Sequence, residues 1–600
     1  MTDTLIDRRD LTFQLYEVMN TEALTERERF SEHSKDTFDA VIETADKMAK
    51  EKFANHNSAA DKDEPKFVNG QVEMLPDVKQ AFDAYAEAGF LAGRYDYDLG
   101  GMQLPESIMA ACNGFFTAAN PGTAGYPFLT TAAANLIRVF GNDEQKTKFL
   151  PNMLSGRYSG TMALTEPYAG SSLADIRTSA TPTDDGHYLI KGAKIYISGG
   201  EQSITENIVH MVLAKIKGAP AGVKGISLFI VPKFHVDENG NPGDRNGVSL
   251  AGLIHKLGYR GTTSTALSFG DDAPCHGYLV GEPHQGLKYM FQMMNEARIG
   301  VGFGAAVIGY RGYMHSLEYA KDRLQGRKAG EKNPESPQVP IIEHADVRRM
   351  LLAQKAYSEG GLALCLYGAR LVDDQHTHPD GQKRMEAGKL LDLLTPVIKA
   401  WPSEYGPKAN DLAIQVYGGA GYTREYPVEQ CWRDNRLNPI HEGTNGIQAL
   451  DLLGRKVWQD QGHGLQLLLQ AMQRDLEAAS SERCQPWALS LSETLQQAVR
   501  VTQSLGQALM SGNPDRPLAN AACYLHLFGH IAVAWMWLRQ ANAAVAGLDT
   551  ATDDGERHFY LGKLQAAQYF FHWELPTVAQ DLVLLRNQDD TCLTMRPEWF

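Results

Sequence analysis

The sequence predicts an α+β protein of several domains, in which helical segments stand on both sides of a β-rich segment. Its 600 residues exceed what one small core can organise, so three or four lobes are expected. Helical spacing of apolar residues extends to about residue 160, β-rich runs follow, and helical spacing then returns. A change of composition near residue 460 indicates a last helical lobe. The predicted domains are residues 1–160 (1–35 being an extension), 161–280, 281–459 and 460–600.

The first two domains differ in the period of their apolar residues. Phe38, Ile42 and Ala45 share one helical face, and glycine pairs such as Gly100-Gly101 mark turns. Short runs rich in β-formers then occupy residues 187–192, 194–199, 208–214 and 225–231. Gly and Asp pairs separate these runs, which predicts an antiparallel β-domain.

The second half of the chain is predicted to be helical throughout. Helical periods cover residues 287–325, 343–372, 381–400 and 405–418, and residues 327–340 form an exposed connection. After residue 460 the chain is rich in Leu, Ala and Gln, and Lys563 is its only lysine. The apolar run Cys523–Leu538 is too short and too polar to span a bilayer, so a buried helix is expected.

Charge and cysteine usage exclude several classes of function. A net charge of -15 without a Lys/Arg cluster does not fit a nucleic-acid partner. The seven cysteines are scattered and never spaced as CxxC, which favours free thiols in a reducing cytoplasm over disulfides or a zinc site. The first thirty residues carry charges throughout, unlike a signal peptide. We therefore expect a cytoplasmic protein without an integral membrane segment or a bound metal.

Glu442 is the most informative single residue. It lies between a Pro-containing segment and Gly443, just before a predicted helix. Asn445 and Gln448, three residues apart, resemble a capping pair at the start of that helix. A carboxylate fixed at a helix start can remove a proton from carbon if water is excluded. The alternative is an acidic residue that only stabilises the helix N-terminus electrostatically.

Three other segments favour the catalytic interpretation. Thr165 and Gly170-Ser171 offer a hydroxyl and turn N–H groups to a phosphate. Tyr196 and Ser198 place an aromatic ring and a hydroxyl on one strand face, and Gly418-Gly419 allow a ligand to approach the backbone. Each segment alone is also compatible with an ordinary turn, strand or loop.

Taken in this order across an α–β–α layout, the four motifs resemble the acyl-CoA dehydrogenase family over roughly residues 35 to 456. The long form is similar to the bacterial branch that acts on fatty acyl-CoA or 3-methylthiopropanoyl-CoA. The resemblance implies a four-helix bundle for the third domain, and FAD bound without a Rossmann fingerprint. It also implies acyl-CoA as substrate, electron-transfer flavoprotein as electron acceptor and a homo-oligomer, for which we expect a dimer.

The resemblance also assigns roles to individual residues. Glu442 is the implied base that takes the α-proton while the β-hydride passes to flavin N5, and Arg298 assists it. The substrate residues would be Ser171, Asn295, Arg298 and Gly443. The FAD residues would be Met162, Leu164, Thr165, Gly170, Ser171, Tyr196, Ser198 and Thr444, with Arg323, Gln415, Gly418 and Gly419 reaching the FAD of a neighbouring subunit.

Other observations restrict or compete with this assignment. Some branches carry the base immediately before the arginine, where this chain has Ala297, so the base is expected at Glu442. Arg298 could instead be a helix-face cation beside Glu296. Ser172 and Gln430 depart from the family pattern near the CoA and FAD phosphates. An acyl-CoA oxidase and a non-catalytic scaffold remain alternatives, and the end of the chain, which carries no peroxisomal tripeptide, favours the dehydrogenase.

Overall fold

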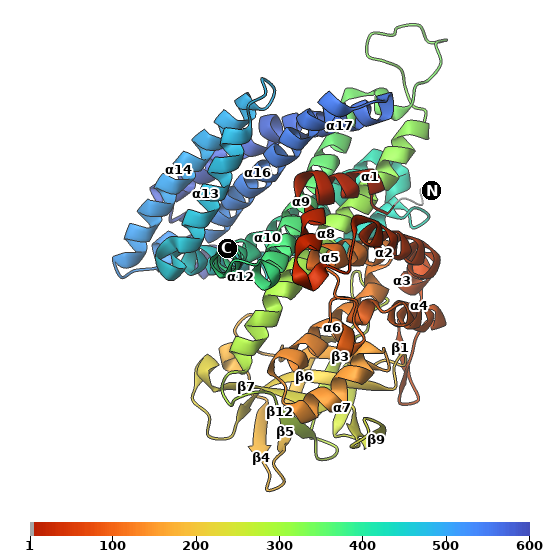
Figure 1. The fold of residues 1–600 in the computed structure, drawn as a ribbon, viewed down its shortest axis with the longest axis vertical. Helices are drawn as coiled ribbons and strands as arrows, with labels where there is room; N and C mark the ends of the chain where they lie inside the picture. The colour runs from red at the N-terminus through yellow and green to blue at the C-terminus, as the bar shows by residue number, and fades with distance from the viewer. Residues whose placement is uncertain (1–4) are drawn as a thin grey trace. The chain divides into compact units, whose positions relative to one another are not determined.

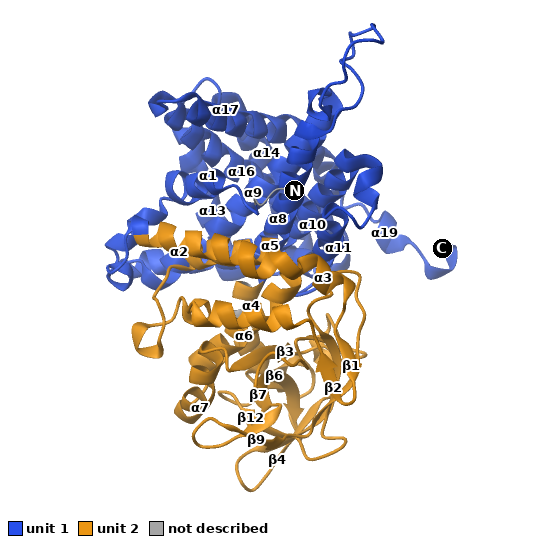
Figure 2. Cartoon of the chain, turned by 90° about the vertical axis from the view of Figure 1, so that its right-hand side faces the viewer, with its two compact units in different colours: residues 1–36, 298–600 blue, residues 37–297 orange. Residues whose placement is uncertain are grey.

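The computed structural model describes residues 5–600, with residues 292–295 described by their backbone alone. Contacts divide the chain into two compact units (Figure 2). We call Thr37–Ala297 the β-unit, and Arg298–Phe600 together with the residues up to Asp36 the helical unit. The helical N-terminal, β-rich middle and helical C-terminal arrangement predicted from the sequence is confirmed. The domain boundaries given above stay a prediction.

The helices that precede the main sheet of the β-unit have between 6 and 20 residues. They are α2 (Lys35–Met48), α3 (Asn57–Lys62), α4 (Pro76–Glu87), α5 (Glu106–Ala119), α6 (Pro121–Phe140) and α7 (Asp143–Leu154). The predicted face of α2 is buried at Phe38, Ile42 and Ala45. α6 follows α5 after one residue, because Asn120 caps it by accepting a hydrogen bond from the Thr123 N–H and Pro121 supplies its first turn.

The main sheet of the β-unit has eight strands, and two of its pairings are parallel. The strand order is β10-β11-β5-β12-β7-β6-β3, with β4 pairing β5 and β6. β6 pairs in parallel with β3 and β4, and the other pairs in this sheet are antiparallel. The strands are β3 (Tyr158–Ala163), β4 (Ser179–Pro182), β5 (Tyr188–Ser198), β6 (Asn207–Ile216), β7 (Ile226–Pro232), β10 (Val248–Leu253), β11 (Ser264–Phe269) and β12 (His276–Leu279).

The two runs predicted as separate strands at 187–192 and 194–199 form the single strand β5. Gly192, between the two predicted runs, lies inside β5 and does not end a strand. A Cβ at this position would lie 2.5 Å from Thr178 Oγ1, so the glycine serves the close approach of a neighbouring segment.

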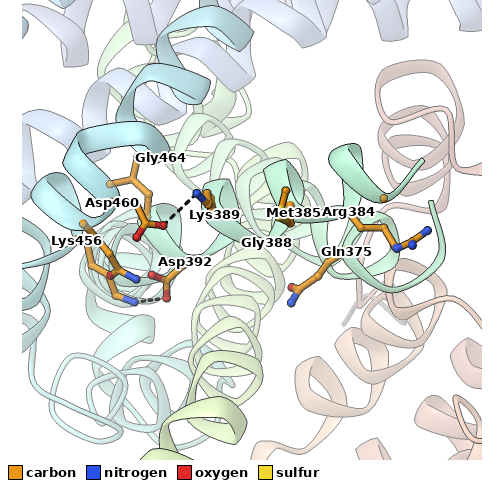
Figure 3. Close-up of a pocket in the computed structure, with 12 residues that line it drawn as sticks. Gln375, Arg384, Met385, Gly388, Lys389, Asp392, Lys456, Asp460 and Gly464 are labelled. Atoms are coloured by element: carbon orange, nitrogen blue, oxygen red, sulfur yellow. Dashed lines mark hydrogen bonds and ion pairs between the residues drawn. The ribbon is translucent and has the colours of Figure 1, made fainter. Parts of the chain in front are cut away.

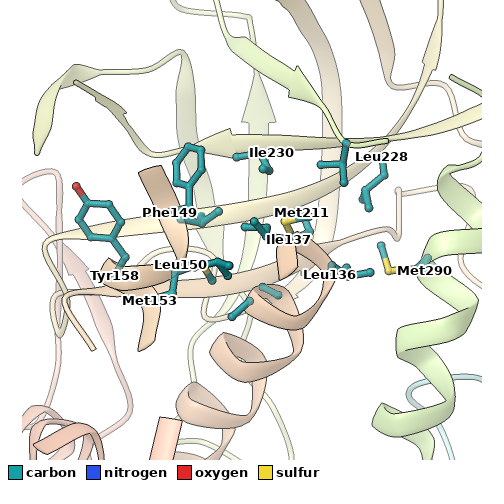
Figure 4. Packing of buried hydrophobic residues seen from close by; sticks show 14 of the residues in the cluster. Leu136, Ile137, Phe149, Leu150, Met153, Tyr158, Met211, Leu228, Ile230 and Met290 are labelled. Carbon is teal, nitrogen blue, oxygen red and sulfur yellow. The ribbon is translucent and has the colours of Figure 1, made fainter. Parts of the chain in front are cut away.

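Helices α6 and α7 supply the apolar layer that covers one face of this sheet. Figure 4 shows Leu136 and Ile137 of α6 and Phe149 of α7 packed against Met211 and Ile230 of the central strands. All five side chains are at most 2% exposed. This core keeps the strand ends that carry the candidate flavin residues in fixed positions.

The helical unit contains the predicted bundle, and its central helix is longer than expected. The helices are α8 (Gly286–Asp322, whose first turns belong to the β-unit), α9 (Ala345–Thr377), α10 (Gly381–Tyr417), α11 (Val428–Asn435) and α12 (Asn445–Gly454). The segments predicted at 381–400 and 405–418 form one helix, although α10 contains three prolines.

The prolines of α10 are tolerated because the helix is buried. Pro402 leaves the carbonyl oxygen of Ile398 without its usual helix donor. The Cys365 Sγ lies 4.0 Å from this oxygen, and a Cβ at Gly302 of α8 would lie only 2.0 Å from it. Close packing of α8 and α9 around the Ile398 carbonyl therefore keeps α10 helical at Pro402, although one hydrogen bond is missing.

The last lobe is also helical, and its longest helix is a core helix. α13 (His463–Ala478), α16 (Ala521–Thr550) and α17 (Asp554–Tyr569) pack with the bundle (Figure 1). α14 (Gln485–Met510) and α18 (Ala579–Asn587) pack on α16. Among the described helices, α16 alone is long and apolar enough to cross a bilayer, yet 83% of its apolar window is buried. Trp535 and Trp537 of α16 are at most 1% exposed. The predicted buried helix at Cys523–Leu538 is confirmed.

A buried ion cluster ties the N-terminal extension to this lobe. Lys563 of α17 is fully buried and pairs with both Asp10 of α1 (Arg8–Thr12) and Glu359 of α9. Asp10 also accepts hydrogen bonds from Tyr310, at 3.1 Å, and from Gln14. Glu359 also pairs with Lys355, whereas Asp10, which is 1% exposed, forms its ion pair with Lys563, so removing the lysine would leave the buried charge of Asp10 uncompensated.

We expect Lys563→Met to destabilise the helical unit by about 3–5 kcal/mol, the cost of breaking a buried charge pair. Thermal unfolding followed by circular dichroism measures the effect. Lys383→Met is the matched control, because Lys383 pairs with Glu386 but its side chain is 58% exposed. That variant should unfold close to the wild-type temperature. Equal midpoints for both variants would contradict the structural role of the cluster.

Candidate active site

Glu442 lies on a strained turn between α11 and α12. Its φ is +51° and that of Gly443 is +84°, so two consecutive residues occupy the left-handed region. For a residue with a side chain this conformation is unfavourable and persists only where surrounding contacts impose it. The position of the carboxylate therefore depends on what holds the turn.

Two buried side chains hold the carbonyl groups of this turn. The Lys399 Nζ of α10 donates to Asn438 O at 2.7 Å and to Gly443 O at 2.8 Å. The Gln448 Nε2 of α12 donates to Glu442 O at 3.1 Å and to Gly443 O at 3.2 Å. Both side chains are fully buried. The carbonyls at both ends of the turn are thus bound by groups from two different helices.

The start of α12 is one residue earlier than predicted. Thr444, not Asn445, is the N-cap, and its Oγ1 accepts a hydrogen bond from the Ile447 N–H at 3.3 Å. Gln448 is not part of a capping pair, because its amide reaches back to the turn. Leu450 of α12 is 45% exposed. The left-handed residues before Thr444 bring it into the extended conformation that an N-cap requires.

The electrostatics around Glu442 combine burial with nearby positive charge. Burial raises the pKa of Glu442, while Lys399 and Arg298 act in the opposite direction. Burial lowers the pKa of Lys399 to about 7. Burial also lowers the pKa of His441 to about 3, so this neighbour is uncharged near neutral pH. The arrangement gives a carboxylate that is partly shielded from water and can exchange a proton.

Arg298 is buried and connects α8 to α12. It is 3% exposed, and its Nη1 lies 3.2 Å from the Asp451 Oδ2. Its Nε has no hydrogen-bond partner among the described residues. Glu296, the partner that we considered as an alternative, instead forms an ion pair with Arg94 at 2.9 Å. The side chain of Asn295 lies outside the described residues.

On the β-unit, a bulge in β5 exposes the residues expected to contact the flavin. The register with β11 shifts between Thr265↔Ile197 and Leu267↔Lys194, and Tyr196 has a φ of +60°. Before the bulge the exposed residues of β5 have odd numbers. After the bulge the exposed residues have even numbers, Tyr196 and Ser198. Tyr196 is 63% exposed. An extra residue in the strand therefore presents an aromatic ring and a hydroxyl together.

The loop that follows β3 is anchored to β5 beneath these side chains. The Ile195 N–H donates to Thr165 O at 2.9 Å. Glu166 pairs with the buried Lys194 at 2.9 Å and accepts hydrogen bonds from the backbone N–H groups of Arg177 and Thr178. Burial raises the pKa of Glu166, but these donors and the lysine charge outweigh it and lower the pKa overall. The loop is thus fixed by an ionised carboxylate.

The residues present on this loop and on β5 fit FAD. The hydroxyls of Thr165, Ser171 and Ser198 have no hydrogen-bond partner within the described chain, and Gly170 is open to solvent. Met162 and Leu164 are half-buried and pack against the core of the β-unit. Free hydroxyls next to an exposed aromatic ring suit a flat ring with polar edges and a phosphate-bearing tail.

The residues predicted to reach a neighbouring subunit lie on one surface of the helical unit. Arg323, Gln415, Gly418 and Gly419 are exposed, and nothing lies within 4 Å of a Cβ built on either glycine. Tyr319 of α8 stacks on Tyr417 of α10 with ring centroids 4.0 Å apart. This stacking places the ends of α8 and α10, and with them the four predicted residues, side by side.

A cavity of about 470 Å³ in the helical unit contains none of the predicted site residues (Figure 3). Lys389 pairs with Asp460 at 3.1 Å and Lys456 with Asp392, while Arg384 donates to the carbonyl oxygens of His378 and Pro379.

Sequence reasoning missed Lys399, the contacts of Gln448 with the turn, and the Glu166–Lys194 pair. Lys399 stands in the apolar context Val397-Ile-Lys-Ala-Trp401, where a charged residue in a predicted buried helix is itself a signal. No comparable signal in the sequence connects Gln448 or Lys194 with its partner.

Comparison with known proteins agrees with this fold. Family models for the N-terminal, middle and C-terminal domains of acyl-CoA dehydrogenase match residues 35–157, 161–271 and 284–457. A model described as acetyl-CoA dehydrogenase C-terminal like matches residues 468–596. The chain is 35% identical over 592 residues to the 3-methylmercaptopropionyl-CoA dehydrogenase of Ruegeria pomeroyi, covering 98% of each. The chain belongs to the acyl-CoA dehydrogenase family.

Two further relatives extend this result. The broad-specificity linear acyl-CoA dehydrogenase FadE5 of Mycobacterium tuberculosis is 33% identical over 606 residues, with 98% of each chain covered. The fold matches that of a Bacillus anthracis acyl-CoA dehydrogenase complexed with FAD, with a TM-score of 0.72 at 21% identity over 92% of this chain and 89% of that one. The predicted family, its flavin-dependent oxidoreductase class and FAD as cofactor are confirmed.

We expect Gly443→Ala to loosen the turn that carries Glu442. An alanine in the left-handed region costs about 1–2 kcal/mol, and its Cβ would lie 2.6 Å from the Gln448 Nε2. Hydrogen exchange of peptides covering residues 438–448, read by mass spectrometry, should become faster. Gly446→Ala is the control, because its Cβ meets only Thr444 Oγ1 at 3.8 Å. Unchanged exchange in Gly443→Ala would show that the turn is not strained.

Proposed function

We propose that this chain catalyses the FAD-dependent α,β-dehydrogenation of an acyl-CoA thioester to a trans-2-enoyl-CoA, with Glu442 as the base that takes the α-proton. The observation that supports this assignment most is the strained, doubly anchored turn that carries a shielded carboxylate. A residue with merely a helix-capping role would not need such a turn, since Thr444 already caps α12.

Removal of an α-proton from a thioester needs both a positioned base and stabilisation of the enolate that forms. Hydrogen-bond donors directed at the thioester oxygen supply this stabilisation, each worth about 3–4 kcal/mol. We assign one donor to the backbone N–H of Glu442, which donates to no acceptor within the described residues. Gly443 would lie beside the bound thioester, and Arg298 supplies positive charge close to the base.

When bound, FAD supplies the acceptor that takes the β-hydrogen as a hydride. Thr165, Ser171 and Ser198 would hold the cofactor by hydrogen bonds, and Tyr196 would pack on its ring. We further propose that Arg323, Gln415 and the Gly418-Gly419 loop complete the cofactor site of a second copy, so that the active form is a dimer. Their shared exposure on the helical unit supports this assignment.

The substrate is an acyl-CoA, and the full-length relatives suggest linear or methylthio acyl chains. Electron-transfer flavoprotein is the electron acceptor that we propose, and the free state of the seven cysteines supports a cytoplasmic location. An assay with a series of acyl-CoA substrates, from short to long and including the methylthio analogue, identifies the preferred chain. Peroxide release under air would instead indicate an oxidase.

We expect Glu442→Gln to keep FAD and acyl-CoA binding but to slow anaerobic flavin reduction by about 10²–10⁴-fold, the usual contribution of a general base. The amide is nearly isosteric but cannot accept the proton. Rapid-mixing absorbance at the flavin band measures the rate. Glu404→Gln is the control, because Glu404 is an exposed residue that pairs with Lys408. Reduction at wild-type rate in Glu442→Gln would contradict the assignment.

A further inference from the structure

Lys399 is a buried lysine without a carboxylate partner among the described residues. It is fully buried in α10, and its Nζ is bound by two carbonyl oxygens, Asn438 O and Gly443 O. Buried lysines in this chain otherwise pair with acids, as Lys194 does with Glu166 and Lys456 with Asp392. A buried ammonium is costly unless it is compensated. Its presence at the base-carrying turn therefore needs a reason.

The hydrogen bonds of Lys399 fix the two ends of the turn. Asn438 precedes the base by four residues and Gly443 follows it directly. The side chain of Asn438 donates to Asn435 Oδ1 at 2.8 Å, so the first end is also tied to α11. Gln448 binds the same Gly443 carbonyl from α12. A single ammonium thus joins α10 to a segment whose backbone would not hold its conformation alone.

The basic groups near Glu442 differ in whether a carboxylate already neutralises them. Arg298 faces the turn from α8, but Asp451 of α12 pairs with it at 3.2 Å, and Arg455 also binds that carboxylate. His441 on the turn itself is uncharged, since burial lowers its pKa to about 3. Among the described residues, Lys399 is therefore the cation near Glu442 that has no ion pair with another carboxylate, and Glu442 is the negative group that acts on it.

From this geometry we propose that Lys399 is a positioning residue for the base: it holds the turn that presents Glu442, and its charge keeps the carboxylate ionised and able to take a proton. The inference rests on Glu442 being the base. Loss of the charge at Lys399 should then change the pH at which the enzyme begins to work, whereas a purely structural role should lower the rate equally at every pH.

The test compares pH profiles of anaerobic flavin reduction in the FAD-loaded enzyme. In Lys399→Met the acid limb should move upward by about one pH unit or more, because an opposite charge nearby lowers a carboxyl pKa by one to three units. The rate at pH 6 should fall at least 10-fold more than the rate at pH 9. Lys399→Arg keeps a permanent cation, so its acid limb should stay in place or move to lower pH.

Further variants separate the possible outcomes. Lys399→Gln keeps a donor without the charge and should show the same upward shift if Lys399→Met does not fold. Lys456→Met removes another buried lysine, paired with Asp392 and not bonded to the turn, and should leave the acid limb unmoved. A wild-type acid limb in both Lys399→Met and Lys399→Gln would overturn the inference. Wild-type reduction in Glu442→Gln would instead overturn the base itself.

Stability provides a readout that does not depend on turnover. The pKa of Lys399 is about 7 in the folded protein, against about 10.4 in an unfolded chain. Between these values the unfolded chain binds a proton that the folded chain does not, so the free energy of unfolding rises with pH. Wild type should gain stability relative to Lys399→Met from pH 7 to pH 10. A constant difference across this range would show that the pKa of Lys399 is not lowered by burial in the folded protein.

Discussion

The left-handed backbone at Glu442 and Gly443 is the constraint on which the candidate base depends. A turn of this kind directs its carbonyl groups inward, and an inward carbonyl in a buried site must be bound by a donor. Lys399 and Gln448 provide the donors from α10 and α12. The helices of the bundle therefore hold the six-residue turn 438–443, and this turn determines the position of the Glu442 carboxylate.

The β-unit also contains a left-handed residue that presents a candidate functional side chain. Tyr196 is also left-handed, here within a strand, and the bulge around it turns Tyr196 and Ser198 outward. Beneath it, the Glu166–Lys194 pair ties the neighbouring loop to the same strand. In both units a locally unfavourable backbone presents a candidate functional side chain, and a buried lysine lies next to it. The cost of each strained residue is of the order of 1–3 kcal/mol, which the surrounding contacts have to supply.

Much of this organisation could be predicted from the sequence. The periodicity changes near residues 160 and 280 located the β-rich segment, and the apolar run at Cys523–Leu538 correctly indicated a buried helix. The motif around Glu442 led to the family because a carboxylate, a glycine and a helix start are local features. The predictions that failed were those of element ends at prolines and at a glycine, because tertiary contacts override these local signals. Prolines did not break α10, and Gly192 did not end β5, because close packing on neighbouring segments governs both places.

The supporting residues could not be predicted, since their partners lie far away in the chain. Lys399 is 39 residues from Asn438 and 44 from Gly443, and no local pattern connects them. The most direct test of the account is α-proton exchange. An acyl-CoA analogue that lacks a β-hydrogen is incubated in D₂O with the FAD-loaded enzyme, and loss of its α-proton signal is followed by NMR. Wild type should exchange the α-proton, and Glu442→Gln should show no exchange above background. Equal exchange with both proteins would contradict it.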